Sequence, residues 1–202
     1  MNWTRLTKEA WTNEISKSDF DVVGTLKFID GRKVSDEKAT LLWGAYWHRI
    51  DRLIFGNAAA KGLRVNRLCF DELGECETNR HLHFVAQAPI DTEMFCAMLN
   101  AVWEDFCFDA AALRLNHITP IRSKRNAAAY IVKEIGDHTF SISGLKCSHR
   151  NTDSLAYNGV SAAKVLNRLQ NKVQHTKLTA ALDVLRLQID AGSKRSARRL
   201  MR

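Results

Sequence analysis

The sequence has few of the features that mark membrane, secreted or zinc-finger proteins. Its 202 residues include two prolines and five cysteines, with no C-x-x-C pair and no apolar run long enough to span a membrane. The first residues, Met-Asn-Trp-Thr-Arg, lack the apolar core of a secretory signal. An odd number of unclustered cysteines is typical of reduced cytosolic thiols that pack as small apolar residues. We therefore expect a folded cytoplasmic protein that has no contact with a membrane.

The positive charge of the chain is concentrated near its C-terminus. The net charge is +8, from 30 Lys and Arg against 22 Asp and Glu. Residues 161–202 contain ten Lys and Arg and two Asp and Glu, so residues 1–160 contain twenty residues of each sign. A basic segment of this kind predicts a polyanionic partner, most simply nucleic acid. The alternative is a solvated basic helix that has no partner.

Hydrophobic periodicity predicts an α+β domain. β-branched and aromatic residues mark four strands, at residues 20–28, 63–70, 81–88 and 113–121. Helical spacing marks three helices, which follow the capping residues Ser35, Asp91 and Asn126. This order favours a central, mainly antiparallel sheet of about five strands with flanking helices. We expect a lead-in, a main domain and a basic helical C-terminal extension, at residues 1–18, 19–160 and 161–202.

Two histidines on one predicted strand form the first candidate site. His81 and His83 flank one apolar residue, and alternation along a strand turns both imidazoles to the same face. Glu72 ends the preceding strand, where a hairpin would bring its carboxylate within cross-strand reach of both rings. Two imidazoles and a carboxylate suit a divalent ion such as Mn²⁺ or Mg²⁺. Glu75 and Glu77 are the alternative third ligands, and histidines that only hydrogen-bond within the sheet are the alternative to a metal.

A tyrosine and a lysine one helical turn apart form the second candidate site. Tyr130 and Lys133 are three residues apart in the last helix of the main domain, so they share one side of it. A phenol is a poor nucleophile near neutral pH, but it becomes effective when a cation stabilises the charge that develops during attack. Lys133 is placed to supply that cation, and its alternative role is to hold a phosphate of the substrate. Taken alone, a tyrosine in an alanine-rich helix is more often a packing residue.

The order and spacing of these patterns resemble those of the HUH endonucleases, specifically the single-tyrosine replication initiator (Rep) proteins of rolling-circle replicons. The three family motifs correspond to the strand at residues 20–28, the His81-Leu82-His83 strand and the Tyr130-x-x-Lys133 helix. The resemblance covers residues 19–136. It implies the ferredoxin-like or RRM-like fold of that superfamily.

The resemblance also implies a metal-dependent nickase of single-stranded DNA. The two histidines and Glu72 would hold the metal, and Tyr130 would attack the scissile phosphate, which leaves a 5′-phosphotyrosine and a free 3′-hydroxyl. The reverse reaction would rejoin ends, so that one site nicks and ligates without ATP. Lys133 matches the lysine of the single-tyrosine pattern. The implied partners are a replication origin of a plasmid or phage, in single-stranded form, and a host helicase and polymerase in the bacterial cytoplasm.

Further residues near the motifs are candidates for DNA contact. Thr25 and Lys27 lie on the first predicted strand, where a structural role is equally expected. Three basic residues lie just before the tyrosine helix and beside the site: Arg122, Lys124 and Arg125. The basic extension is expected to bind adjacent duplex or hairpin DNA, or to mediate assembly through its apolar stripe Leu178–Ile189. The sequence leaves the oligomeric state open.

Departures from related enzymes narrow the prediction. No second tyrosine lies at helical spacing from Tyr130, so one nucleophile is expected. No G-x-x-x-x-G-K-[ST] motif is present, so the protein must borrow a helicase or act on DNA that is already unpaired. Relaxases usually cluster three histidines, and tyrosine transposases more often pair the tyrosine with a glutamine. These two enzymes are the alternatives, whereas the other histidines, including His117, show no ligand spacing. The alternative without catalysis is a nucleic-acid-binding sheet, which would need Phe84 to face solvent.

Overall fold

The protein has an α+β fold built on one open antiparallel sheet, as expected. The computed structural model describes residues 2–74, 79–107, 111–133, 135–136, 140–141, 143–151, 157 and 159–200. The sheet order is β4-β1-β3-β2-β5, and each strand is antiparallel to its neighbours. The strands are β1 Val22–Lys27, β2 Arg67–Glu72, β3 His81–Ala86, β4 His117–Pro120 and β5 Phe140–Ser141. Four strands therefore make up the body of the sheet, and the two-residue β5 adds a short edge pair.

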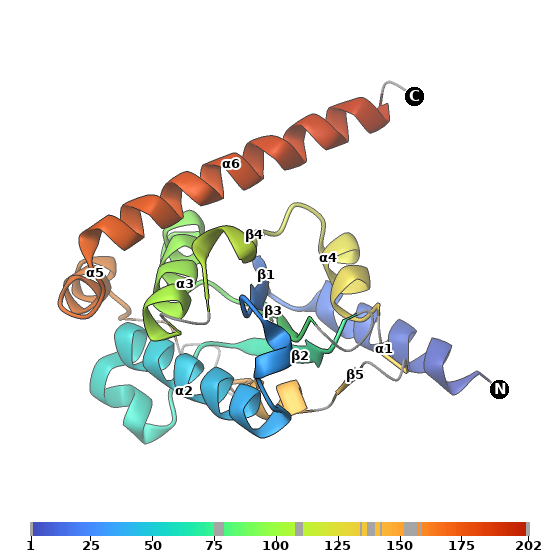
Figure 1. The fold of residues 1–202 in the computed structure, drawn as a ribbon, viewed down its shortest axis with the longest axis horizontal. Helices are drawn as coiled ribbons and strands as arrows, with labels where there is room; N and C mark the ends of the chain where they lie inside the picture. The colour runs from blue at the N-terminus through green and yellow to red at the C-terminus, as the bar shows by residue number, and fades with distance from the viewer. Residues whose placement is uncertain are drawn as a thin grey trace.

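Helices cover both faces of the sheet (Figure 1). The described helices are α1 Trp3–Lys17, α2 Asp36–Phe55, α3 Thr92–Phe106, α4 Lys124–Ile131, α5 Ala162–Gln170 and α6 His175–Leu200. α2 and α3 pack on one face, in the larger core, which α5 and α6 extend. α1 and α4 pack on the other face, in a smaller core around Phe70 and Val85. Within the described part of the chain, no helix combines the length and apolar character needed to cross a membrane.

Capping residues set the ends of the long helices as the sequence predicts. Ser35 accepts a hydrogen bond from the backbone N–H of Lys38 at the start of α2. Gly56 ends α2 with a φ of 59°, a left-handed conformation that residues with a Cβ rarely adopt. Asp91 caps α3 by accepting from the N–H of Met94. The predicted positions of these two helices are therefore confirmed.

The tyrosine helix differs from its predicted limits. Ser123 is the cap, because its hydroxyl accepts from the N–H of Asn126, which lies inside α4. The helix also ends two residues before Lys133. The chain turns there, and Val132 and Ile135 become buried in the smaller core. Burial of these two residues thus ends the helix earlier than the local sequence suggests.

Two strands also differ from their predicted limits. β2 begins at Arg67 and not at residue 63, and it continues to Glu72, because its pairing with β3 defines it. Residues 113–115 form a short 3₁₀ turn, so β4 starts only at His117. Apolar composition predicted both strands, but the hydrogen-bonded partner determined where each one starts.

Phe84 lies in the core and not on the surface of the sheet. Its side chain is fully buried and packs edge-on against Trp47, with 5.2 Å between ring centroids. Gly24 lies directly opposite on β1, and a Cβ there would come within 2.1 Å of the Phe84 ring. Phe84 is therefore not a platform for stacking bases, which removes the feature that a non-catalytic nucleic-acid-binding sheet would need.

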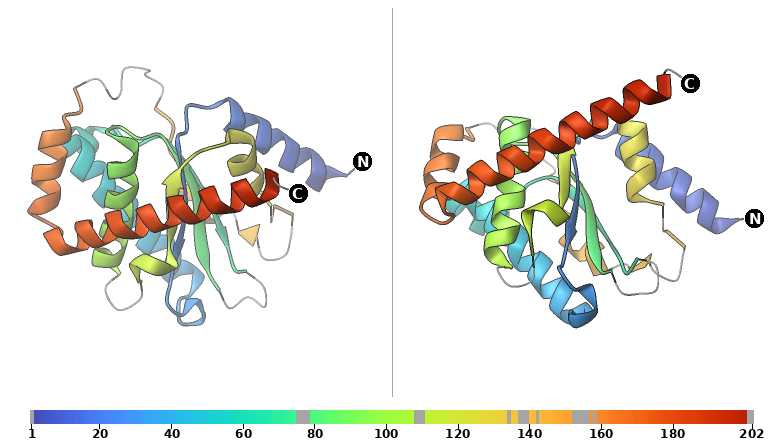
Figure 2. Two further views of the ribbon diagram at one scale, coloured as in Figure 1. Left: turned by 90° about the horizontal axis from the view of Figure 1, so that it is seen from above. Right: turned by 45° about the horizontal axis from the view of Figure 1, so that its top comes forward.

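α5 and α6 are part of the main core. Both helices contribute to it with buried or half-buried residues: Val165, Leu169, Leu178, Leu182, Leu185 and Ile189. The apolar stripe of the basic extension therefore packs on its own domain. Figure 2 shows α6 running outside the two helical layers and past β4.

Candidate active site

The register of three strands brings the predicted metal ligands to one end of the sheet. Glu72 lies opposite His81 in the β2–β3 pair, as predicted, and His83 lies opposite Thr25 in the β1–β3 pair. Alternation along each strand turns these side chains to one face, the face on which α1 and α4 pack. Residues from three strands therefore meet at one point.

Glu72, His81 and His83 form a compact, buried group of donor atoms. Nε2 of His83 is 2.9 Å from Oε2 of Glu72 and 3.1 Å from Nε2 of His81. Nε2 of His81 is 3.4 Å from Oε1 of Glu72. Ligands that bind one ion at about 2.1 Å lie about 3 Å from each other, so these separations suit a shared cation. The alternative ligands Glu75 and Glu77 lie outside the described residues.

Hydrogen bonds to the far ring nitrogens prepare both histidines to bind a metal. Nδ1 of His81 contacts the carbonyl oxygen of Asn79, which can only accept, so Nδ1 carries the proton and Nε2 carries a lone pair. Nδ1 of His83 is 2.9 Å from Oγ1 of Thr25, a hydroxyl that can accept a hydrogen bond from a protonated Nδ1. In this tautomer two lone pairs and a carboxylate converge on one point, where a divalent cation can bind all three. Without a cation, protonated Nε2 of His83 can instead donate to the Glu72 carboxylate at 2.9 Å. The donor set therefore fits a divalent metal.

Burial and hydrogen bonding favour the ligand forms of His83 and Glu72 at neutral pH. Burial lowers the pKa of His83, and the hydrogen bond to Glu72 opposes this only in part. Burial alone would raise the pKa of Glu72, but its hydrogen bonds to His81 and His83 outweigh burial and hold that pKa well below its usual range. A neutral imidazole and an ionised carboxylate are the forms that bind metal.

Tyr130 projects from α4 toward this group. Its hydroxyl is 3.5 Å from Oγ1 of Thr25, and its ring lies edge-on to His83 with 4.9 Å between centroids. The side chain is 44% exposed, so a substrate can reach it. Ala127 and Ala128 are buried on the same helix, and their small side chains let α4 lie close to the sheet. The Thr25 hydroxyl thus contacts both the predicted nucleophile and a predicted metal ligand.

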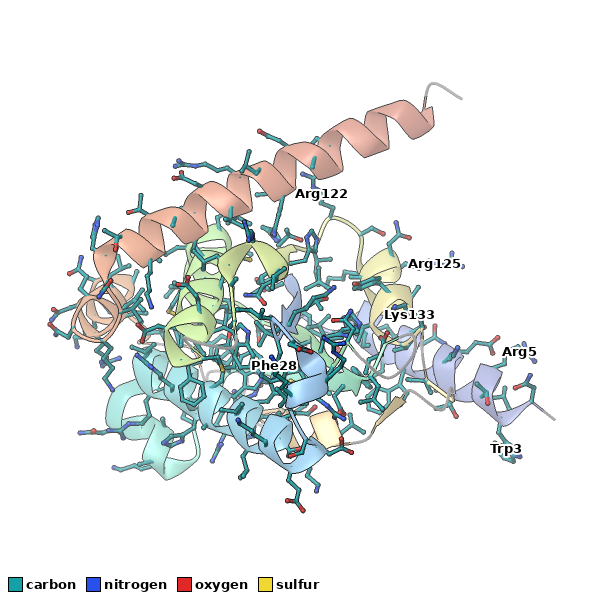
Figure 3. All side chains as sticks on the ribbon, in the orientation of Figure 1. Trp3, Arg5, Phe28, Arg122, Arg125 and Lys133 are labelled. Carbon is teal, nitrogen blue, oxygen red and sulfur yellow. The ribbon has the colours of Figure 1, made fainter. Side chains whose placement is uncertain are left out.

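Lys133 reaches the same site from the turn after α4. Its Nζ is 3.4 Å from Oε1 of Glu72 and 5.5 Å from the centre of the Tyr130 ring. Lys8 of α1 donates to the carbonyl of Lys133 and so holds this turn in place. Figure 3 shows Lys133 at the lower end of α4. The structure therefore brings the lysine and the tyrosine together, although not through the helical spacing that the sequence predicted.

The two DNA-contact candidates on β1 have different surroundings. Thr25 is 1% exposed and has little surface to offer DNA, so its hydroxyl instead serves the metal group. Lys27 is half-buried and lies opposite His81, on the same face of the sheet. Lys27 is thus the candidate on this strand whose position suits a substrate phosphate.

The three basic residues predicted to precede the tyrosine helix are spread around the site, and Lys124 and Arg125 lie in the first turn of α4 and not before it. Arg122 lies between the loop and α6, where it donates to the carbonyl of Ile189 (Figure 3). Lys124 donates to the carbonyl of Ser18. Arg125 points outward and lines a shallow hollow beside α1 (Figure 3). Arg122 and Lys124 therefore anchor the start of α4 and the residues just before it. Arg125 faces a different side of α4 from the metal group.

A groove beside Tyr130 has no counterpart in the sequence patterns. It has a volume of about 530 Å³ and is lined by β1, β4, the loop before α4, α4 and α6. His117 lines it from β4, directly opposite Thr25. The spacing of His117 in the sequence did not predict a role for it, because only the β1–β4 register places it opposite Thr25. We call this hollow the Tyr130 groove.

Comparison with protein-family models, with curated proteins and with solved structures finds no significant match for this chain. The resemblance to HUH endonucleases therefore rests on the order of the motifs alone. The chemistry rests on the geometry: a buried group of Glu72, His81 and His83 that could hold a metal ion, with an accessible tyrosine beside it.

Proposed function

We propose that this protein nicks and rejoins single-stranded DNA through a covalent 5′-phosphotyrosine, as the initiator of rolling-circle replication of a plasmid or phage. One observation carries the proposal. The Thr25 hydroxyl lies 2.9 Å from Nδ1 of His83 and 3.5 Å from the hydroxyl of Tyr130. It therefore joins a candidate metal group and a candidate nucleophile in one site.

The topology supports this assignment. From β1 to β4 the elements follow the order β1-α2-β2-β3-α3-β4, and the corresponding strands lie in the order β4-β1-β3-β2. We class this arrangement as a ferredoxin-like fold, whose element order is the same. Its two central strands, β1 and β3, carry the Thr25 hydroxyl and the two histidines, and α4 adds the tyrosine after β4.

In the proposed reaction Tyr130 is the attacking group. Its oxygen forms a bond to the scissile phosphorus as the phenolic proton is released, and the bond from phosphorus to the 3′-oxygen breaks, so that this oxygen takes up a proton. Lys133, beside the Tyr130 ring, supplies positive charge against the charge that builds on the phosphate oxygens. A divalent ion held by Glu72, His81 and His83 would polarise the phosphate. The phosphotyrosine keeps the energy of the broken bond, so the reverse step joins ends without ATP.

The test is formation of a covalent adduct. The protein is incubated with Mn²⁺ and a randomised pool of single-stranded oligonucleotides, and adducts are resolved on denaturing gels and mapped by mass spectrometry. We expect an adduct on the peptide that contains Tyr130, which is lost in Tyr130→Phe, in His83→Ala and after addition of EDTA. His48→Ala, which changes an exposed histidine of α2, is the matched control and should keep the adduct.

Two outcomes would contradict the proposal. An adduct that persists in Tyr130→Phe would show that another residue is the nucleophile. Failure of the wild-type protein to form an adduct with any sequence would favour a protein that binds nucleic acid without cutting it. Because the chain has no P-loop motif, the proposal also requires a helicase from the host or a substrate that is already unpaired.

A further inference from the structure

The Tyr130 groove is bounded by four elements of the fold. β1 and the edge strand β4 form its floor, and α4 and α6 form its walls. Figure 2 shows α6 crossing β4 at the edge of the sheet and continuing toward α4. The volume of about 530 Å³ falls within the usual range of ligand sites. Tyr130 lines the groove, so whatever occupies it lies next to the proposed nucleophile.

Specific contacts hold α6 as a wall of the groove. Arg122, in the loop before α4, donates to the carbonyl of Ile189. Gly192 lies one turn further along α6, and a Cβ there would come within 3.3 Å of the Arg122 guanidinium. Gln188 donates to a carbonyl just before β4, which adds a second link between α6 and the sheet edge.

The side chains that line the groove suit bases better than phosphates. They offer hydroxyl, amide and imidazole groups with a single guanidinium: His117, Thr119, Arg122, Ser123, Asn126 and Gln188. Phosphates are held mainly by Arg and Lys, whereas base edges are read by hydrogen-bonding groups of the kinds found here. The guanidinium is already bound to α6. The described lining also contains no carboxylate that would repel a polyanion.

We propose that the Tyr130 groove binds the nucleotides of single-stranded DNA that flank the scissile phosphate, and that it reads their bases. This inference rests on the proposed function, because that function places the scissile phosphate at Tyr130. The positive charge that attracts the DNA backbone comes from another part of the protein. α6 continues beyond Gly192 into a basic sequence that includes Lys194, Arg195, Arg198 and Arg199. The groove thus selects the sequence, and the basic end of the chain attracts the phosphates.

The test measures binding, so that it does not depend on cleavage. Protein carrying Tyr130→Phe is used to select sequences from a randomised pool of single-stranded DNA, and we expect a short enriched motif. In this background, Asn126→Ala and His117→Ala should each weaken binding of the motif about tenfold, while binding of the unselected pool changes little. Asn167→Ala in α5 and His48→Ala in α2 remove exposed side chains of the same types outside the groove. These matched controls should bind the selected motif as tightly as the Tyr130→Phe protein does.

Three results would overturn the inference. They are unchanged motif and affinity in both groove variants, no enriched motif at all, and stronger selection of single-stranded RNA than of DNA. His117 and Asn126 lie on different elements, so a folding defect in one variant, detected by urea unfolding, leaves the other to decide. Adduct formation by the wild-type protein is then measured on the enriched motif. If the groove variants lose the motif but the wild-type protein forms no adduct on it, the proposed nickase activity is wrong and the base-reading role of the groove still holds.

Discussion

Replacing Thr25 with valine should weaken metal binding without unfolding the protein. Valine has nearly the shape of threonine and suits a strand, so the packing of this buried position changes little. The substitution removes the oxygen that lies 2.9 Å from Nδ1 of His83. The proton of His83 then stays on Nε2, which donates a hydrogen bond to the Glu72 carboxylate at 2.9 Å, because Nδ1 no longer has an acceptor. The metal-free protein therefore keeps a satisfied histidine, but the lone pair that a metal needs is lost.

The size of the effect follows from this change of tautomer. Metal binding would return the proton to Nδ1 and leave a buried donor without a partner, which costs about 1–3 kcal/mol. That range agrees with the loss of about 10- to 100-fold in affinity that is typical when a ligand histidine loses its hydrogen-bond partner. In the wild-type protein, Mn²⁺ at about 100 times its Kd should raise the free energy of unfolding by about 2.7 kcal/mol. With an affinity about 100-fold weaker, the same concentration should add only about 0.4 kcal/mol.

The assay is urea unfolding with and without Mn²⁺, combined with calorimetric titration of Mn²⁺. Thr25→Ser keeps the hydroxyl and should bind the ion like the wild-type protein. In the absence of metal, Thr25→Val should unfold at nearly the wild-type urea concentration. Equal Mn²⁺ affinity in the valine variant and the wild type would refute the argument that Thr25 sets the tautomer of His83.

Three further predictions concern the stability of the fold. Arg67→Met should lower the free energy of unfolding, measured with urea, by about 3–5 kcal/mol. Arg67 donates two hydrogen bonds of 2.8 and 3.1 Å to the buried carboxylate of Asp51, and the substitution leaves that charge without its buried cation. Gly24→Ala should lower it by about 1–3 kcal/mol, because a Cβ would collide with the Phe84 ring, and the additional change Phe84→Leu should recover part of the loss. Burial raises the pKa of Cys107 to about 12, so the folded state holds a proton that the unfolded state loses above its ordinary pKa. The free energy of unfolding should therefore fall as pH rises from about 9 toward 12, by up to about 1.4 kcal/mol per pH unit for this thiol. Urea unfolding of Cys107→Ala should show a shallower decline with pH, and a slope identical to that of the wild type would contradict the raised pKa of Cys107.

Local patterns in the sequence predicted most of the elements of the fold. Ser35, Gly56 and Asp91 marked the ends of α2 and α3, because a cap depends on residues within one turn of it. The pairing of Glu72 with His81 was also predictable, since a hairpin links two strands that are close in sequence. The metal half of the site therefore follows from the sequence.

The tyrosine half of the site was predicted by residue but not by geometry. Lys133 meets Glu72 from a turn and not from a helix, because burial of Val132 and Ile135 ends α4 early. Nothing near Thr25 in the sequence indicates that its hydroxyl contacts both His83 and Tyr130. These contacts join residues 58 and 105 positions apart, so they form only when the sheet and α4 come together.

The sequence by itself determined the class of fold, the capped ends of α2 and α3 that Ser35, Gly56 and Asp91 mark, and the residues of the candidate metal group, because these depend on composition and on neighbours within a turn or a hairpin. Only the tertiary structure decided that α6 packs on the main domain, that His117 faces a groove, and that the groove lies beside Tyr130. The physical reason is strand register and long-range burial. The antiparallel pairing of β1 with β4 sets the position of His117, and burial of α6 side chains in the shared core sets the wall of the groove.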